Sequence, residues 1–187
     1  SDSTPKAAVW FDYDNDGFED LLIGKRMLRN TGTGEFVDVT SEVGLGRLPT
    51  AAGFALADYD GDGWVDLYLT ISSQGPKATG GRRSSWLRDE TAPGNQLWRN
   101  NEGHFENVTD LANASAGHRS TFSAAWLDAD GDGRPDIAVV DEFGAPVLLR
   151  NRGDGSFDER PLCDGFGGFC MGVAAGDLDE DGRSDLY

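Results

Sequence analysis

Four short acidic segments share one aspartate spacing, D-x-D-x-D-G-x-x-D, and they begin at Asp12, Asp58, Asp128 and Asp177. Aspartates at the first, third, fifth and ninth positions supply only oxygen ligands, and glycine at the sixth position permits the tight turn that brings them together. Oxygen-only ligation suits a hard cation. It favours calcium over zinc or copper, and over magnesium with its strict octahedral geometry. The alternative is a set of acidic surface turns without metal.

The predicted ligands are the four aspartate side chains of each loop and the backbone carbonyl oxygen of its seventh residue. They are Asp12, Asp14, Asp16, Phe18 and Asp20 in the first loop, Asp58, Asp60, Asp62, Trp64 and Asp66 in the second, Asp128, Asp130, Asp132, Arg134 and Asp136 in the third, and Asp177, Asp179, Asp181, Arg183 and Asp185 in the fourth. The predicted cofactor is therefore one Ca²⁺ per loop, up to four.

The flanking residues distinguish these loops from EF-hands. An EF-hand has glutamate at the twelfth position, where the first three segments have Ile23, Leu69 and Val139. Strand-like apolar residues also stand on both sides of each loop. The segments therefore predict calcium-binding β-hairpin loops.

The composition agrees with a bound cation. The formal net charge is −17, from 33 acidic and 16 basic residues, and the aspartates predicted as ligands are 16 of the acidic ones. Four Ca²⁺ ions add eight positive charges and would bring the net charge to −9. The acidic balance argues against nucleic acid and anionic membrane surfaces as partners, and no apolar run is long enough to insert into a membrane. Five Trp and ten Phe argue against disorder.

The elements that must position the loops recur with them. A strand of small residues precedes each loop (Gly53–Ala57 in the second copy) and an apolar strand follows it (Leu67–Thr70). A third strand then ends in Asn before a Gly-rich turn (Leu97–Phe105), and a fourth begins at an aromatic residue (Phe36–Thr40 in the first copy). This order predicts a four-stranded antiparallel blade.

The loop starts are separated by 46, 70 and 49 residues, and a period in the high forties suits one propeller blade. We therefore predict an all-β fold: a single partial β-propeller over residues 1–187, with about three and a half blades. The expected boundaries are about 7–45 for blade 1, 51–112 for blade 2 with an insertion at 71–95, 120–162 for blade 3 and 170–187 for a half blade. Other polypeptide is expected to complete the ring, because an open arc exposes strand edges.

The insertion at 71–95 is where basic residues gather: Lys77, Arg82, Arg83 and Arg88, with Trp86 as a candidate anchor. A long loop on a rigid scaffold is a common binding element. The insertion is predicted to contact an acidic protein partner or a glycan, and the alternative is a solvated loop packed on the neighbouring blade.

Two cysteines, Cys163 and Cys170, stand in the segment CDGFGGFC. Their spacing fits neither a zinc knuckle nor a C-x-x-C redox pair. A short local disulfide is the favoured interpretation, in keeping with an extracellular protein. The alternative is a pair of reduced, partly buried thiols.

The acidic loops and their blade context resemble FG-GAP/VCBS repeat proteins, the propellers of integrin α-subunits and many bacterial secreted proteins. The pattern from Asn30 to Leu45, N-x-G-x-G-x-F followed by D-V-T and G-L, is similar to the ASPIC/UnbV-associated branch. The resemblance implies a ring of usually seven blades, calcium in the hairpin loops, and extracytoplasmic roles in adhesion or assembly.

The predicted function is a calcium-binding extracytoplasmic scaffold, an accessory subunit for protein–protein interaction, adhesion or assembly. No catalytic motif such as G-x-S-x-G, H-E-x-x-H or a phosphate loop is present, so a non-enzymatic protein is expected. Some relatives are polysaccharide lyases. The alternative is thus part of a carbohydrate-binding or polysaccharide-lyase propeller whose active residues lie outside this chain.

Overall fold

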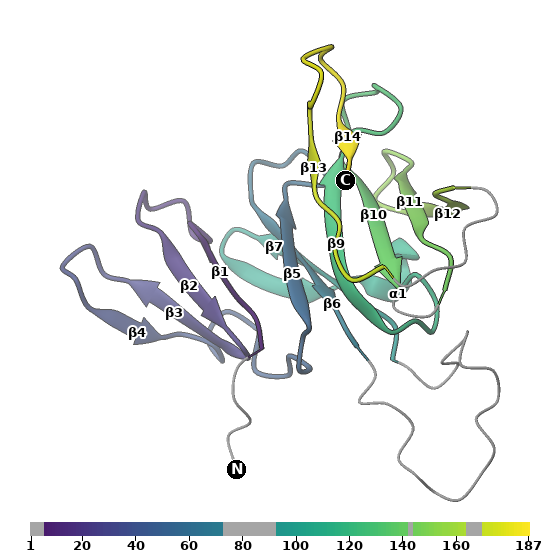
Figure 1. Cartoon of the computed structure of the whole chain (residues 1–187). Helices are drawn as coiled ribbons and strands as arrows, with labels where there is room; N and C mark the ends of the chain where they lie inside the picture. Colours follow the sequence, from purple (N-terminus) through teal and green to yellow (C-terminus); the bar gives the residue numbers. More distant parts are fainter. Residues whose placement is uncertain (1–5, 73–92, 142–143, 164–169) are drawn as a thin grey trace, which may run out of the picture.

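Three four-stranded antiparallel sheets and a two-stranded hairpin follow one another along the chain (Figure 1). The computed structural model describes residues 6–72, 93–141, 144–163 and 170–187. The elements are β1 (Ala8–Phe11), β2 (Asp20–Ile23), β3 (Arg26–Asn30), β4 (Phe36–Asp38), β5 (Gly53–Ala57), β6 (Asp66–Thr70), β7 (Gln96–Asn101), β8 (His104–Asn107), α1 (Thr109–Ala112), β9 (Thr121–Leu127), β10 (Asp136–Asp141), β11 (Val147–Asn151), β12 (Phe157–Pro161), β13 (Ala175–Gly176) and β14 (Asp185–Leu186).

Each sheet is a meander in which every strand pairs with the next one in the sequence, in the orders β1-β2-β3-β4, β5-β6-β7-β8 and β9-β10-β11-β12. Strands β13 and β14 pair in the same antiparallel way. The first strands of the sheets lie side by side, β5 against both β1 and β9, and β13 against β9 (Figure 1). The predicted all-β propeller of four-stranded blades is therefore confirmed, as an arc whose ring is not closed.

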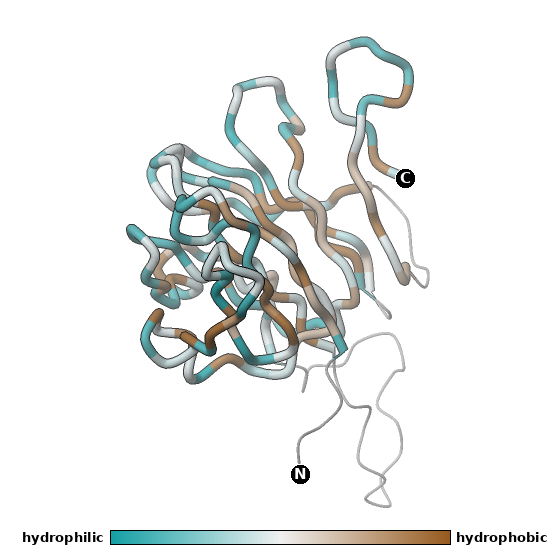
Figure 2. Tube along the Cα trace, turned by 90° about the vertical axis from the view of Figure 1, so that its left-hand side faces the viewer, coloured by the Kyte–Doolittle hydropathy of each residue, from teal (hydrophilic) through white to brown (hydrophobic). Residues whose placement is uncertain are grey.

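The second strand of a blade shows how neighbouring blades determine burial. All residues of β6 and β10 are buried, whereas β2 alternates between buried and half-buried positions. Blades 2 and 3 have a neighbour on each face, so their second strands carry continuous apolar runs such as Ile137–Val140. Blade 1 has one open face, so β2 needs to be apolar on one side only. Figure 2 shows hydrophobic residues along the strands and hydrophilic ones at the hairpin loops.

Two hydrophobic clusters fill the spaces between blades. One joins Phe11 and Tyr13 of blade 1 to Phe105 of blade 2. The other joins Tyr59 of blade 2 to Phe157 of blade 3. The ring centroids are 6.3 Å apart for Tyr13–Phe105 and 5.7 Å apart for Tyr59–Phe157. The aromatic residue of the Gly-rich turn therefore packs against the acidic loop of the preceding blade.

The fourth strands are shorter than predicted. At their ends a threonine side-chain hydroxyl, instead of a backbone carbonyl, accepts the hydrogen bond from the backbone N–H of the third strand. Strand β4 ends at Asp38, and Thr40 Oγ1 accepts a hydrogen bond from the backbone N–H of Met27 at 2.8 Å. Thr109 Oγ1 accepts one from the N–H of Leu97 at 2.9 Å in the same way. The chain is then free to turn, and in blade 2 it forms the short helix α1, which the sequence analysis did not predict.

The tryptophans of the strands differ in burial. Trp98 is buried and Trp126 packs against Tyr68 between blades 2 and 3, but Trp10 is 55% exposed. It lies on the open face of blade 1, where it makes an edge contact with Phe36 at 5.8 Å.

The predicted disulfide is not formed in this structure: Cys163 and Cys170 are free, the former exposed and the latter half-buried. Lys77, Arg82, Arg83, Trp86 and Arg88 of the insertion lie outside the described residues. Within the described residues, none of the helices has the length and apolar character needed to cross a membrane.

Candidate metal centres

The four acidic loops fold in the same way. The glycine at the sixth position has a φ of 88° in Gly17 and Gly63, 84° in Gly133 and 85° in Gly182, as the tight turn requires. The fourth position is also left-handed, in Asn15, Gly61, Gly131 and Glu180. The D-x-D-x-D-G-x-x-D spacing leaves that position variable. Its Asn and Gly residues were a usable signal, because these residues enter the left-handed region most readily.

Backbone N–H groups hold the first aspartate of each loop. In the second loop, Asp58 Oδ1 accepts hydrogen bonds from the N–H groups of Gly61 (2.9 Å) and Asp62 (3.0 Å), and Oδ2 accepts one from Gly63 (2.8 Å). The fifth-position carboxylate caps the next turn, because Asp62 Oδ1 accepts from the N–H of Trp64 at 3.0 Å. These bonds fix the orientation of both carboxylates.

Each loop brings three carboxylates together, with ligand oxygens within 4.8 Å of one another. The groups are Asp12, Asp14 and Asp20; Asp58, Asp60 and Asp62; Asp128, Asp130 and Asp136; and Asp177, Asp179 and Asp185. The fourth carboxylate of each loop, Asp16, Asp66, Asp132 or Asp181, is not a member of these groups. The carbonyl oxygens of Phe18, Trp64, Arg134 and Arg183 remain predicted ligands.

The ninth aspartate connects the loop to the rest of its blade. Asp66 is buried, and its carboxylate accepts hydrogen bonds from the N–H groups of Tyr59 (3.0 Å) and Asn100 (2.8 Å). Asp20 and Asp136 make the equivalent pairs of bonds. Burial raises the pKa of Asp66 to about 7 and that of Asp20 to about 6, although these N–H groups oppose the shift.

An asparagine at the end of the third strand joins consecutive blades, a role that the sequence analysis missed. The side-chain amide of Asn100 donates to the carbonyl oxygen of Tyr13, in the loop of the preceding blade, at 2.8 Å. Asn151 donates to the carbonyl oxygen of Tyr59 at the same distance. The recurrence of this asparagine was visible in the sequence, but its partner could not be found without the packing of the blades.

The first loop contains an oxygen atom whose environment fits a cation. Asp14 Oδ1 is buried and accepts no hydrogen bond from the described residues. Burial, and the charges of Asp16 and Asp12, raise the pKa of Asp14. A buried, unpartnered carboxylate oxygen among further carboxylates is costly unless a positive charge approaches it, so the donor set fits Ca²⁺.

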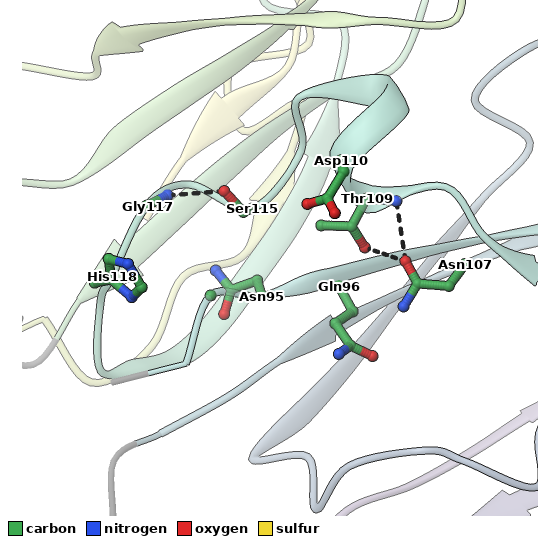
Figure 3. A pocket seen from close by; sticks show the side chains of 9 residues that line it. Asn95, Gln96, Asn107, Thr109, Asp110, Ser115, Gly117 and His118 are labelled. Carbon is green, nitrogen blue, oxygen red and sulfur yellow. Dashed lines mark hydrogen bonds between the residues drawn. The ribbon is translucent and has the colours of Figure 1, made fainter. Parts of the chain in front are cut away.

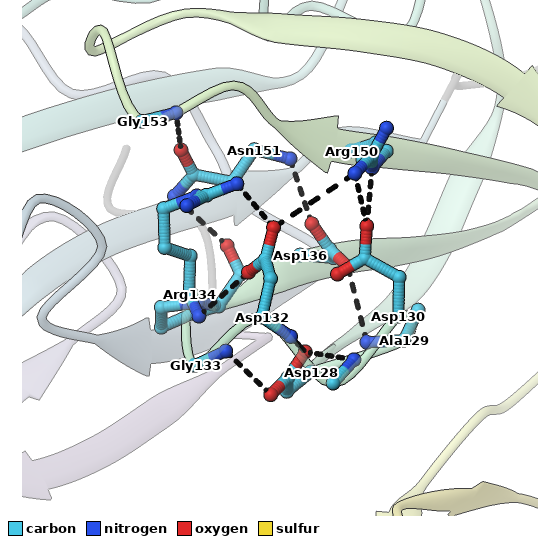
Figure 4. A network of polar contacts seen from close by, with 12 residues as sticks. Asp128, Ala129, Asp130, Asp132, Gly133, Arg134, Asp136, Arg150, Asn151 and Gly153 are labelled. Atoms are coloured by element: carbon cyan, nitrogen blue, oxygen red, sulfur yellow. Dashed lines mark hydrogen bonds and ion pairs between the residues drawn. The ribbon is translucent and has the colours of Figure 1, made fainter.

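The third loop shows how arginines interact with the same positions. Figure 4 shows Arg150 beside Asp130 and Asp132, and Arg134 beside Asp132. The ninth aspartate, Asp136, accepts a hydrogen bond from the N–H of Asn151 at 2.7 Å. The loop carboxylates in this structure are therefore partly neutralised by side chains of their own blade.

A polar cavity of about 360 Å³ lies apart from the loops, where the start of β7 meets the segment after β8. Figure 3 shows Gln96, Asn107, Asp110 and His118 around it. Amide, carboxylate and imidazole groups line this cavity together, and such groups can hydrogen-bond a polar ligand such as a sugar.

The fold is similar to that of a solved lectin from Agrocybe aegerita that recognises non-reducing terminal N-acetylglucosamine. The TM-score is 0.58 at 20% sequence identity, and the match covers 98% of this chain and 47% of the lectin chain. The chain thus spans about half the length of that lectin. No curated protein matched the sequence.

A family model for the FG-GAP-like repeat matches three segments of the chain, residues 12–69, 85–139 and 128–187. These segments contain the four acidic loops and most of the described strands. The match and the blade architecture agree with each other. The chain belongs to the FG-GAP-like repeat family.

Proposed function

We propose that this chain is part of a calcium-binding, extracytoplasmic β-propeller scaffold that mediates protein–protein interaction, adhesion or assembly as an accessory subunit. One observation carries the proposal: a three-carboxylate group recurs in all four loops, built from the first, third and ninth aspartates in three of them and from the first, third and fifth in the second. A single acidic cluster is common on protein surfaces without a metal. Four such clusters built by the same backbone turn favour a shared ligand.

The first-, third-, fifth- and ninth-position aspartates would hold the ion, together with the seventh-position carbonyl. A bound Ca²⁺ supplies the positive charge that offsets the repulsion between these carboxylates. The protein's own contribution is to keep the first and ninth aspartates fixed through backbone N–H groups, as Asp58 and Asp66 show. Such preorganisation lowers the entropic cost of binding.

The proposed extracytoplasmic location rests on the proposed calcium binding, because extracellular calcium-binding modules work at about 10⁻⁴–10⁻³ M Ca²⁺. The proposal includes a non-catalytic role, in which the loop carboxylates serve as ligands. The basic insertion at 71–95, mostly outside the described residues, is proposed to contact the protein partner.

Calcium binding can be tested by calorimetry and thermal unfolding of the whole chain. We expect up to four Ca²⁺ per chain and a melting temperature that falls by about 5 °C or more in excess EGTA. Asp14→Asn should reduce the calcium-dependent rise in melting temperature. Glu35→Gln, which removes one exposed charge outside the loops, should leave that rise unchanged. An unchanged melting temperature on chelation would refute the proposal.

A second candidate is glycan binding. Two observations favour it: the fold resembles that of a lectin, and a polar cavity lies beside β7 (Figure 3). A glycan array probed with the whole chain tests this candidate. Binding that Gln96→Ala weakens, while the calcium-dependent melting temperature is unaltered, would support it; an array without binding would leave the protein-binding scaffold as the only candidate.

A further inference from the structure

Each complete blade has an arginine immediately before the asparagine near the end of its third strand: Arg29, Arg99 and Arg150. Successive side chains of a strand point to opposite faces. In blades 2 and 3 the asparagine therefore approaches the preceding blade, whereas the arginine is directed to the acidic loop of its own blade.

The arginine contacts in the second loop are direct. Arg99 Nε lies 2.7 Å from Asp60 Oδ2, and Arg99 Nη2 donates to Asp62 Oδ2 at 2.9 Å. One guanidinium thus spans the third- and fifth-position carboxylates, two of the predicted ligands. The contact of Nη2 with Asp62 is a hydrogen bond, whereas Nε approaches Asp60 as an ion pair without hydrogen-bond geometry.

The third loop has two such contacts. Arg150 Nε donates to Asp130 Oδ2 at 2.5 Å, and Arg150 Nη2 lies 3.9 Å from Asp132 Oδ2. Arg134 also donates to Asp132 (Figure 4). The third- and fifth-position carboxylates of this loop therefore share their charge with two guanidinium groups.

The first loop differs. Within the described residues, no ion pair reaches Asp12, Asp14, Asp16 or Asp20. Arg29 opposes the raised pKa of Asp14 only through its charge, as a smaller contribution than burial and the neighbouring aspartates. Asp14 stands at the loop position of Asp60 and Asp130, and its Oδ1 is buried without a hydrogen bond from the described residues.

We propose that Arg99 and Arg150 are built-in counter-ions that compete with the divalent cation for the second and third loops, so that the first loop fills at lower calcium concentration. The inference rests on the proposed calcium binding. A cation that enters the second loop must displace a guanidinium that already neutralises Asp60 and Asp62. In the first loop it meets an unpaired carboxylate oxygen.

The test is a site-resolved calcium titration of the whole chain by NMR, followed at the amides of Gly17, Gly63 and Gly133, one in each loop. We expect the Gly17 resonance to shift at lower calcium concentration than the other two. Arg99→Gln should lower the midpoint for Gly63 by about two- to fivefold, the effect of removing a partly exposed ion pair. The Gly17 and Gly133 midpoints should stay unchanged, and Arg150→Gln should act on Gly133 alone.

Arg26→Gln is the matched control. It removes the same charge from an exposed pair with Asp38 at 2.9 Å, away from the loops, and all three midpoints should stay in place. Arg99→Lys keeps the charge without the guanidinium group and should give a Gly63 midpoint between those of the wild type and Arg99→Gln.

The outcomes distinguish a failure of the arginine competition from a failure of calcium binding. If calcium binds but Arg99→Gln leaves the Gly63 midpoint unchanged or raises it, the arginine does not compete, and the inference is wrong while calcium binding stands. If none of the three glycine resonances responds to calcium in the wild type, the proposed calcium binding itself fails.

Discussion

The ninth aspartate of each loop has a structural role that is independent of any cation. Both oxygens of Asp66 accept backbone N–H groups, one from the start of the loop and one from the third strand. The carboxylate thus joins three parts of the blade at a buried position. Each oxygen keeps a further lone pair, so the same side chain can approach a cation without breaking these bonds.

The raised pKa values predict a pH dependence of calcium stabilisation. Burial raises the pKa of Asp20 to about 6 and that of Asp66 to about 7, whereas an unfolded aspartate titrates at about 3.9. Because the folded-state pKa values are raised, the contribution of these two carboxyls to folding stability is fully present at low pH. It is lost as the pH rises through about 6–7. A nearby Ca²⁺ favours the charged form and reverses this loss. The calcium-induced rise in melting temperature should therefore be larger at about pH 8 than at about pH 5.

Differential scanning fluorimetry with calcium or EGTA at both pH values measures this difference. Magnesium at the same ionic strength controls for non-specific screening. Equal calcium-induced gains at the two pH values would show that the buried carboxyls and the cation are not linked.

At the scale of the elements, an asparagine that bridges two blades should contribute more to the free energy of unfolding than an equivalent asparagine that bonds within its own blade. Asn100 is fully buried, donates to the carbonyl oxygen of Tyr13 in blade 1, and accepts from the N–H of Gly103. Asn100→Ala leaves these buried groups unpaired and should cost about 1–3 kcal/mol. Asn30→Ala is the matched control, because Asn30 is half-buried and bonds only within its own blade; it should cost less than about 1 kcal/mol. Urea unfolding measures both, and equal losses would contradict the bridging role.

The aromatic residue of the Gly-rich turn offers a second comparison of equivalent positions. Phe157 is 1% exposed and packs against Tyr59 of blade 2, whereas Phe36 is 43% exposed on the open face of blade 1. Phe157→Ala should cost about 3–5 kcal/mol, because it opens a cavity between two blades. Phe36→Ala should cost less than about 1 kcal/mol. Chemical denaturation of the two variants tests this; similar losses would mean that the open face is buried in solution.

The sequence predicted the loops well and the contacts between blades poorly, for a physical reason. A cation loop is a local structure, because spacing and glycine position determine which carboxylates can meet; Asp12, Asp14 and Asp20 do meet. The contact of Asn100 with Tyr13 joins residues that are distant in sequence. No spacing rule identifies such a partner before the blades are placed side by side.

The same limit applies to the whole molecule. The strand order within a blade followed from its repeated pattern, but the exposure of a side chain depends on whether a further blade covers it. Trp10 and Trp126 occupy equivalent strands, and only Trp126 has a neighbouring blade on its face. Exposed apolar residues accordingly concentrate on the first and last sheets, with Phe36 at one end of the arc and Leu178 and Tyr187 at the other.

This arrangement predicts a gradient of local stability along the arc. All residues of β6 and β10 are buried, and each of these strands pairs with a strand on both sides. Strands β13 and β14 have two half-buried residues each and pair only with one another. Backbone amides exchange through local opening, which is easiest where few apolar contacts must break. Hydrogen–deuterium exchange in EGTA should therefore be fastest in β13–β14 and slowest in β6 and β10.

Calcium should change this gradient at one end only. Asp177, Asp179 and Asp185 come together between β13 and β14, so a cation in the fourth loop would link two strands that are otherwise held by few contacts. We expect calcium to slow exchange in β13–β14 by about tenfold or more, the effect of a ligand at several times its Kd. The protection of β6 should change far less, because its opening already requires separating two blade interfaces.

Asp179→Asn, which removes one carboxylate of the group, should abolish the calcium effect in β14 and leave the exchange of β6 unchanged. Equal protection of β14 and β6 without calcium would show that the last hairpin is stabilised by contacts other than those described.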